Sequence, residues 1–190
     1  KFFSDIPAKK IPDRPEIHLE SVKPETLQLK TDQSYGLVMI SFRMPGYDDP
    51  DYPASQVLSD VLSSQRGSLF ALVPQGKALY AGFSLSTLPK AGLGYAVAAF
   101  SRGADASALV VEMKKILAED VTNGLPPDLV EAAKRREVAD LEFQKNSVEG
   151  LASLWSQALA VEGRHSPEED MEAIKAVSSP HTNAPAPMRT

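Results

Sequence analysis

Polar and apolar residues alternate along three stretches of the chain, which predicts three β-strands. The three stretches are residues 36–44, 76–87 and 92–102. In the first, Val38, Ile40 and Phe42 lie on one face of the strand, and Ser41 and Arg43 lie on the other. Four residues that include a proline join the second stretch to the third, so these two strands are expected to form an antiparallel hairpin.

Apolar residues recur every three or four positions in five other segments, which predicts helices. The segments are about residues 51–64, 105–122, 126–145, 147–162 and 166–177. The predicted inner positions of the first helix are Ala54, Val57, Leu58, Val61 and Leu62, and those predicted to face away are Ser55, Gln56, Ser59 and Asp60. The predicted stripe of the second is Leu109, Val110, Met113, Ile116, Leu117 and Val121. We expect Asp105 to cap this second helix and Gly124 to end it.

The elements follow the order β-α-β-β-α-α-α with a further helix at the end. This order is typical of an α+β fold in which helices pack on a largely antiparallel sheet. Residues 66–75, between the first helix and the hairpin, fit either a helical turn or a short strand. Residues 1–26 contain four prolines and are predicted to be an interdomain linker. Residues 27–178 are predicted to form a single α+β domain, and residues 179–190 a disordered tail.

Three aspartates, Asp48, Asp49 and Asp51, stand together before the first helix and raise the question of a metal site. A calcium-binding loop of the EF-hand type needs a central glycine and a closing glutamate, and neither follows these residues. An aspartate before a helix can instead accept hydrogen bonds from free N–H groups of the first turn. We therefore predict that Asp49 or Asp51 caps the helix and that the cluster binds no metal.

Composition narrows the classes of function. The chain has 190 residues, a net charge of −5 and no cysteine, which argues against nucleic acid as a partner and excludes disulfides and thiolate catalysis. The basic group Lys134-Arg135-Arg136 is expected to be a solvated helix face. No apolar run is long enough to span a membrane. Because the chain begins with Lys1, we expect an excised piece of a longer protein, and both periplasm and cytoplasm are compatible locations.

Motifs for catalysis are missing from the sequence. The histidines are His18, His165 and His181, and none has a second histidine at the spacing of a zinc-binding helix, so we expect surface residues. No G-x-S-x-G nucleophile motif occurs. Gly92 and Gly94 lack the third glycine of a phosphate-binding loop and more simply indicate close backbone approach at the hairpin.

Several segments, in their order along the chain, resemble the second domain of a half of the pitrilysin/insulinase-type zinc peptidases, a family that includes mitochondrial processing peptidase. The segments are "FSDIPA" at residues 3–8, "PGYDDPDYPASQVLSDVLSS" at 45–64, "RGSLFALVPQGKALYAGF" at 66–83 and "GLPPDLVEAAKR" at 124–135. The resemblance extends over about residues 3–178. It implies a repeated α+β domain, of which pairs form a half, and two halves that close around a peptide.

The resemblance also implies a division of roles. The family's H-x-x-E-H zinc motif lies in the first domain of the active half, and nothing in this chain matches it. The resemblance therefore implies no cofactor here, with zinc held by the catalytic domain of the parent protein. The family can also hold substrate with an arginine and a tyrosine seven residues apart. Tyr80 matches the tyrosine, whereas Val73 stands at the arginine position. Tyr80 is thus a weak candidate for substrate binding, and we expect it instead to be a strand residue packed against a helix.

Two hypotheses follow. In the first, the chain is a non-catalytic domain of a zinc metallopeptidase that supports the catalytic domain or subunit and walls the peptide chamber, so that peptide is a partner only indirectly. In the second, it is a stand-alone scaffold that binds a partner chain through a sheet edge or an apolar helix face. Neither gives this chain a catalytic site of its own.

Overall fold

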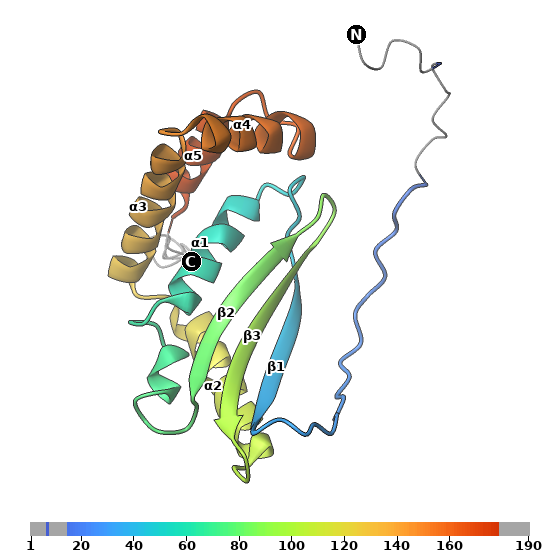
Figure 1. The fold of residues 1–190 in the computed structure, drawn as a ribbon, viewed down its shortest axis with the longest axis vertical. Coiled ribbons are helices and arrows are strands. Elements are labelled where there is room, and N and C mark those ends of the chain that lie inside the picture. The colour runs from blue at the N-terminus through green and yellow to red at the C-terminus, as the bar shows by residue number, and fades with distance from the viewer. Residues whose placement is uncertain (1–6, 8–14, 179–190) are drawn as a thin grey trace, which may run out of the picture.

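The structure is a computed structural model that describes residue 7 and residues 15–178. Its three strands form one antiparallel sheet in the order β1-β3-β2 (Figure 1). The strands are β1 Tyr35–Met44, β2 Tyr80–Thr87 and β3 Gly92–Ser101. The hairpin between β2 and β3 is confirmed, and so is the α+β class. Residues 15–34 form no helix or strand, and each of them is exposed.

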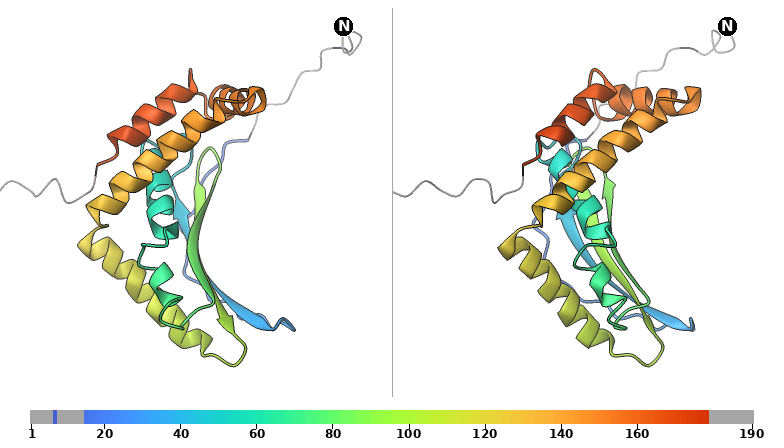
Figure 2. Two further views of the ribbon diagram at one scale, coloured as in Figure 1. Left: turned by 60° about the vertical axis from the view of Figure 1, so that its left-hand side comes forward. Right: turned by 90° about the vertical axis from the view of Figure 1, so that its left-hand side faces the viewer.

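The helices all lie on one side of the sheet (Figures 1 and 2). They are α1 Tyr52–Ser63, the 3-10 helix η1 Phe70–Leu72, α2 Ala106–Asn123, α3 Pro127–Gln144, α4 Val148–Ser156, the π-helix η2 Gln157–Val161 and α5 Pro167–Ala176. The segment 66–75 therefore contains a helical turn rather than a strand. No helix in the described part of the chain has the length and apolar character needed to cross a bilayer.

The main core lies between the sheet and α2. It consists of Val38, Leu62, Leu69, Leu72, Ala78, Ala81, Phe83, Ala96, Ala98, Leu109 and Met113. Alternation along the strands turns Ala96 and Ala98 of β3 toward the helices, and both are fully buried. Their small side chains leave room for Met113 of α2, which is also fully buried. The predicted stripe of α2 is wrong at its end, because Val121 is 86% exposed.

The predicted close approach at the two hairpin glycines is confirmed. A Cβ on Gly94 would lie 2.8 Å from Cζ of Phe83 and 2.7 Å from Cγ of Met44. A Cβ on Gly92 would lie 2.7 Å from the carbonyl oxygen of Pro45. Glycine therefore lets the turn after β1 pack directly onto the end of β3.

Helix α1 is covered on two sides, which the sequence pattern did not indicate. One side packs on β2 and the other on α3 and α5, where a second core is formed by Val57, Val61, Leu129, Val130, Ala133 and Ile174. The predicted orientation is therefore wrong for Ser55 and Asp60, which are buried, and for Ala54, which is exposed. Buried Ser55 donates its hydroxyl to the Asp51 carbonyl, and Asp60 forms an ion pair with Arg136 of α3.

The predicted solvated face of α3 is wrong for Lys134. Its side chain is only 13% exposed, and its Nζ lies 2.9 Å from Glu131 and 2.8 Å from the Val177 carbonyl oxygen. Because Val177 ends α5, this lysine attaches the last helix to α3. The long methylene stem of lysine can be covered while its ammonium group is bonded.

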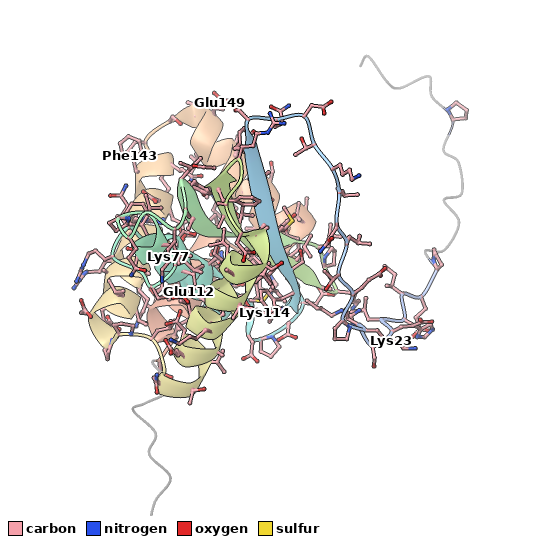
Figure 3. All side chains as sticks on the ribbon, turned by 90° about the horizontal axis from the view of Figure 1, so that it is seen from below. Lys23, Lys77, Glu112, Lys114, Phe143 and Glu149 are labelled. Atoms are coloured by element: carbon pink, nitrogen blue, oxygen red, sulfur yellow. The ribbon has the colours of Figure 1, made fainter. Side chains whose placement is uncertain are left out.

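Helix α2 begins at a cap that the sequence predicted correctly. The Asp105 carboxylate accepts hydrogen bonds from the N–H groups of Ser107 and Ala108 at 2.9 and 3.1 Å. Gly124, with φ of +76°, ends the helix in a backbone conformation that favours glycine. On the helix surface, Glu112 lies 3.0 Å from Lys77, an ion pair that joins α2 to the turn before β2 (Figure 3).

We expect Asp105→Ala to lower the free energy of unfolding by about 1 kcal/mol, because two N–H groups of the first turn lose their acceptor. Urea unfolding followed by circular dichroism measures this change. Asp51→Ala is the matched control, since Asp51 is also an N-cap residue but accepts no capping bond from its helix. Equal losses in the two variants would contradict the assignment of the Asp105 cap.

Candidate functional site

The sheet face opposite the helices is the most prominent functional candidate. Alternation turns its side chains away from the core, and we call this surface the open face. Its large exposed members, with their exposed fractions, are Tyr35 (42%), Leu37 (59%), Met39 (59%), Tyr80 (56%) and Leu93 (49%). They come from all three strands and lie side by side through the pairings of Met39 with Val97 and of Leu37 with Ala99. A surface of this kind can contact another polypeptide.

Tyr80 stands at the start of β2 and belongs to the open face. Its ring lies along its own strand over Gly82, because a Cβ placed on Gly82 would lie only 2.9 Å from the Tyr80 hydroxyl oxygen. The expectation that Tyr80 packs against a helix is therefore wrong. Its neighbours Ala81 and Phe83 face the helices, while Tyr80 presents an exposed phenol beside Ala99 of β3.

Val73 lies on the other side of the sheet from Tyr80. It follows the 3-10 helix η1, donates its N–H to the Phe70 carbonyl, and packs against the main core. Val73, which stands at the position of the family's arginine, thus packs against the core. The structure does not bring Val73 and Tyr80 together on one face.

The described histidines lie apart from each other. His18 is exposed in the segment before β1, with Glu16 at 3.6 Å, and His165 is exposed before α5. His181 lies outside the described residues. Among the residues that the structure describes, no group of three or more His, Cys, Asp or Glu side chains is arranged to hold a metal ion.

The aspartates before α1 organise a turn. The Asp49 carboxylate accepts the N–H of Asp51 at 2.9 Å, and the Asp48 carboxylate lies 2.9 Å from Lys90 of the hairpin. The hydrogen bond between Lys90 and Asp48 raises the pKa of the Lys90 ammonium group above its ordinary value. The prediction of a side-chain cap is wrong for Asp51, because its φ and ψ of −87° and 2° lie outside the extended region that a capping residue adopts. The second residue of the helix is Pro53, which has no N–H to be capped.

A polar pocket of about 280 Å³ lies between α1, α3 and the end of β2. Its lining includes Tyr52, Gln56, Asp60, Arg136 and Glu137. Burial raises the pKa of Glu137 above its ordinary value. Asp60 is already paired with Arg136, and this ion pair joins α3 to α1. Of the serines in the lining, Ser63 donates its hydroxyl to the Phe83 carbonyl oxygen, and neither described histidine lines the pocket. The lining therefore offers no nucleophile with a histidine base beside it.

A second polar cluster, missed by the sequence analysis, lies beside this pocket. Arg164 makes two short ion pairs, with Glu162 at 2.8 Å and Asp170 at 2.9 Å, and all three side chains are at most 16% exposed. Burial, together with the charges of Glu162 and Asp170, raises the pKa of Tyr52. Burial likewise raises the pKa of Asp170, although Arg164 opposes the shift. The contact of this cluster with Tyr52 has no signal in the sequence pattern, because α1 and α5 meet only through tertiary packing.

Comparison with protein families gives one match. The model described as the peptidase M16 inactive domain matches residues 1–137 of the chain. A comparison with curated proteins gives no match.

Similar solved structures share the fold at low sequence identity. A protease from Helicobacter pylori has a TM-score of 0.70 and 18% identity over 78% of this chain, which spans 37% of that protein. The inactive peptidase domain of a candidate zinc protease from Bordetella parapertussis has a TM-score of 0.69 and 18% identity, with 80% of this chain and 84% of that one covered. The periplasmic protease PqqL from Escherichia coli has a TM-score of 0.58 and 14% identity, with 80% of this chain and 17% of that one covered.

Proposed function

Because the chain belongs to the peptidase M16 inactive domain family, we propose that it supports the catalytic domain of a zinc metallopeptidase and walls the chamber that holds the peptide. As a member of an inactive-domain family, the chain itself is non-catalytic. In this proposal the zinc ion is bound by the catalytic domain, where it acts as a Lewis acid on the scissile carbonyl. The alternative of a stand-alone interaction module finds no support among the related proteins.

The observation that supports the wall is the one-sided sheet. All helices cover one face, and the other presents Leu37, Met39, Tyr80 and Leu93 to solvent. Apolar side chains on a flat, hydrogen-bonded strand surface can contact many peptide sequences, because such contacts depend on area rather than on one charge. A chamber that accepts varied peptides needs a surface of this kind.

We also propose the domain limits and the polypeptide partner. Residues 27–178 form the domain, and residues 1–26 link it to a preceding one. The exposure of residues 15–26 and their lack of helix or strand support a linker. The predicted disordered tail, residues 179–190, lies outside the described residues. The partner is the domain or subunit that carries the zinc motif.

Reconstitution tests the proposed function. The chain alone, with zinc, is expected to leave a fluorogenic peptide uncleaved, whereas adding it to the separately expressed catalytic domain of the parent protein should raise kcat/KM. Hydrolysis by the chain alone that a chelator abolishes would contradict the non-catalytic role. Failure to alter the activity of the catalytic domain would contradict the supporting role.

Tyr80 is proposed to contact the peptide from the open face. In the reconstituted enzyme, we expect Tyr80→Ala to raise KM by about threefold to tenfold with kcat nearly unchanged, because a contact made equally in ground and transition states is lost. Tyr80→Phe should retain most of the affinity if the ring makes the contact. Val111→Ala on α2 is a control at an exposed residue (66%) away from the open face. An unchanged KM for Tyr80→Ala would contradict this role.

A further inference from the structure

The outer edge of β1 has none of the features that normally prevent an edge strand from pairing. β1 is ten residues long, contains no proline, and pairs with β3 at every residue without a bulge. Arg43 is its single charged residue. Natural edge strands are usually short, bulged, covered or charged, because their free N–H and C=O groups would otherwise bind another strand. Among the described residues, the strand that pairs with β1 is β3, on its inner side.

The opposite edge of the sheet is protected. The Ser63 hydroxyl of α1 donates to the Phe83 carbonyl oxygen of β2 at 2.6 Å. This bond places the end of α1 against β2, so a strand added there would have to displace the helix. Of the two edges, β1 is therefore the one open to pairing.

The hydrogen bonds also indicate which β1 groups face outward. The Phe83 carbonyl points to α1, away from β3, so its partner Ala96 directs its own backbone groups toward β1. Ala96 pairs with Ile40, so Ile40 directs its backbone N–H and C=O groups toward β3. Because these groups alternate in direction along an antiparallel strand, the other even-numbered residues of β1 also face β3. The N–H and C=O groups that remain free belong to the odd-numbered residues, Tyr35, Leu37, Met39, Ser41 and Arg43.

An apolar groove of about 470 Å³ runs beneath this edge, between β1 and α2. It is lined by the apolar residues Ile40, Phe42, Leu117, Ala118 and Val121, together with Lys114 and Thr122. Lys114 projects from α2 near β1 in Figure 3. Phe42 and Val121 are 38% and 86% exposed. A strand added outside β1 would place alternate side chains over this groove and cover it.

We propose that the occupant is the β1 strand of a second copy of the chain, which makes one six-stranded sheet across a twofold axis. With the axis at Met39, residues 35–43 pair with the same residues of the other copy in reverse order. The free N–H and C=O groups of the odd-numbered residues in one copy then face those of the other copy. Ile40 then faces Val38 of the second copy over the groove. Arg43 faces Tyr35 of the second copy, a cation beside an aromatic ring, and no like charges oppose each other.

This self-complementarity is the reason for choosing a second copy over an unrelated strand. The same ten residues supply both the free backbone groups and the apolar side chains that the groove requires. Residues 15–34 pass the outer side of β1 in Figure 1, but each of them is exposed. Their hydrogen bond from Gln33 to Thr31 and their ion pair between His18 and Glu16 stay within the segment. They therefore do not hold the position beside β1. The inference does not depend on the proposed peptidase role.

Sedimentation velocity of the 190-residue chain, from about 1 to 100 µM, tests the proposal. We expect a concentration-dependent dimer. Met39→Glu should weaken dimerisation at least about tenfold, because the twofold axis brings two carboxylates to opposed positions about 5.5 Å apart between Cα atoms. Met39 is 59% exposed, so the variant is expected to fold, and circular dichroism checks this.

Tyr80→Glu is the matched control. Tyr80 lies on the same open face at 56% exposure, but on β2, the strand farthest from the proposed interface. Dimerisation of this variant should be unchanged. A wild-type chain that remains monomeric at every concentration overturns the proposal. So does a dimer that Met39→Glu leaves intact, or one that Tyr80→Glu weakens equally, since the latter would indicate pairing through the sheet face.

Discussion

Replacing Leu72 by alanine is expected to lower the free energy of unfolding by about 3–4 kcal/mol. Leu72 is completely buried in the main core, where η1, β2, β3 and α2 meet. Its backbone is fixed as well, because its carbonyl accepts hydrogen bonds from Lys77 and Ala78 at 3.0 and 3.1 Å. The surrounding elements therefore cannot close the cavity left by the missing methyl groups, which is the condition for a large loss.

Urea unfolding at neutral pH measures this loss, with Leu88→Ala as the control for the same chemical change. Leu88 lies at the β2–β3 turn and is 69% exposed, so its truncation should cost less than about 0.5 kcal/mol. A loss below about 1.5 kcal/mol for Leu72→Ala would show that η1 can move into the cavity, and that this short helix is not a rigid part of the core.

The elements of the fold were largely predictable because they depend on local patterns. The β2–β3 hairpin follows from alternation around Pro89, and the start of α2 follows from Asp105 and its capping chemistry. The resemblance to the pitrilysin/insulinase-type peptidases, carried by segments such as residues 45–64, is confirmed by the family match. It gave the non-catalytic role that no single motif in this chain could give.

The environment of each helix was less predictable. The periodicity of apolar residues indicates the most apolar face of a helix, but it does not indicate whether a second element packs on another face. Asp60 is polar and yet 8% exposed, since Arg136 reaches it from α3, 76 positions later in the chain. The helix predicted at residues 147–162 shows the converse, because apolar Val148 of α4 and Leu159 of η2 are 90% and 54% exposed. In both cases tertiary packing, which depends on distant segments, decides burial.

The candidate functional surface shows the same limit. Tyr80 was identifiable because it matches the tyrosine of the arginine–tyrosine pair in the pitrilysin/insulinase-type family, but the direction of its side chain was predicted wrongly. Phe83 and Ala81 point to the helices, so the side chain of Tyr80 must point to the open face. The assignment of a strand residue to one face depends on the register with β3, which a single strand pattern leaves open.

The buried ion pairs around Arg164 have a consequence for stability. They connect the segment after η2 with α5, and α5 in turn covers α1 through Ile174 of the second core. The ion pairs of Arg164 thus help to hold α5 in its place on α1. Breaking such a cluster by removing one member is costly, because the partner charges stay buried without compensation.

Arg164→Ala is therefore expected to lower the free energy of unfolding by about 3 kcal/mol at pH 7. The loss should shrink toward pH 4.5. Burial already raises the pKa of Asp170, so the folded state binds this proton more readily than the unfolded state, and the stability from the group falls as pH rises through that pKa. Without Arg164, which opposes the shift, the pKa of Asp170 rises further, and acid then neutralises the uncompensated charge.

Urea unfolding at pH 7 and at about pH 4.5 measures both effects, and two further variants separate their causes. Arg66→Ala removes an arginine that forms an ion pair with Asp128 at 2.6 Å, and the two side chains are 67% and 63% exposed. The free energy of unfolding of this variant should fall by less than about 1 kcal/mol. Arg164→Ala combined with Asp170→Asn should recover part of the stability at pH 7, because the buried carboxylate is gone. Equal losses for Arg164→Ala and Arg66→Ala, or a loss for Arg164→Ala that does not change with pH, would show that water reaches this cluster and that packing alone holds α5 on α1.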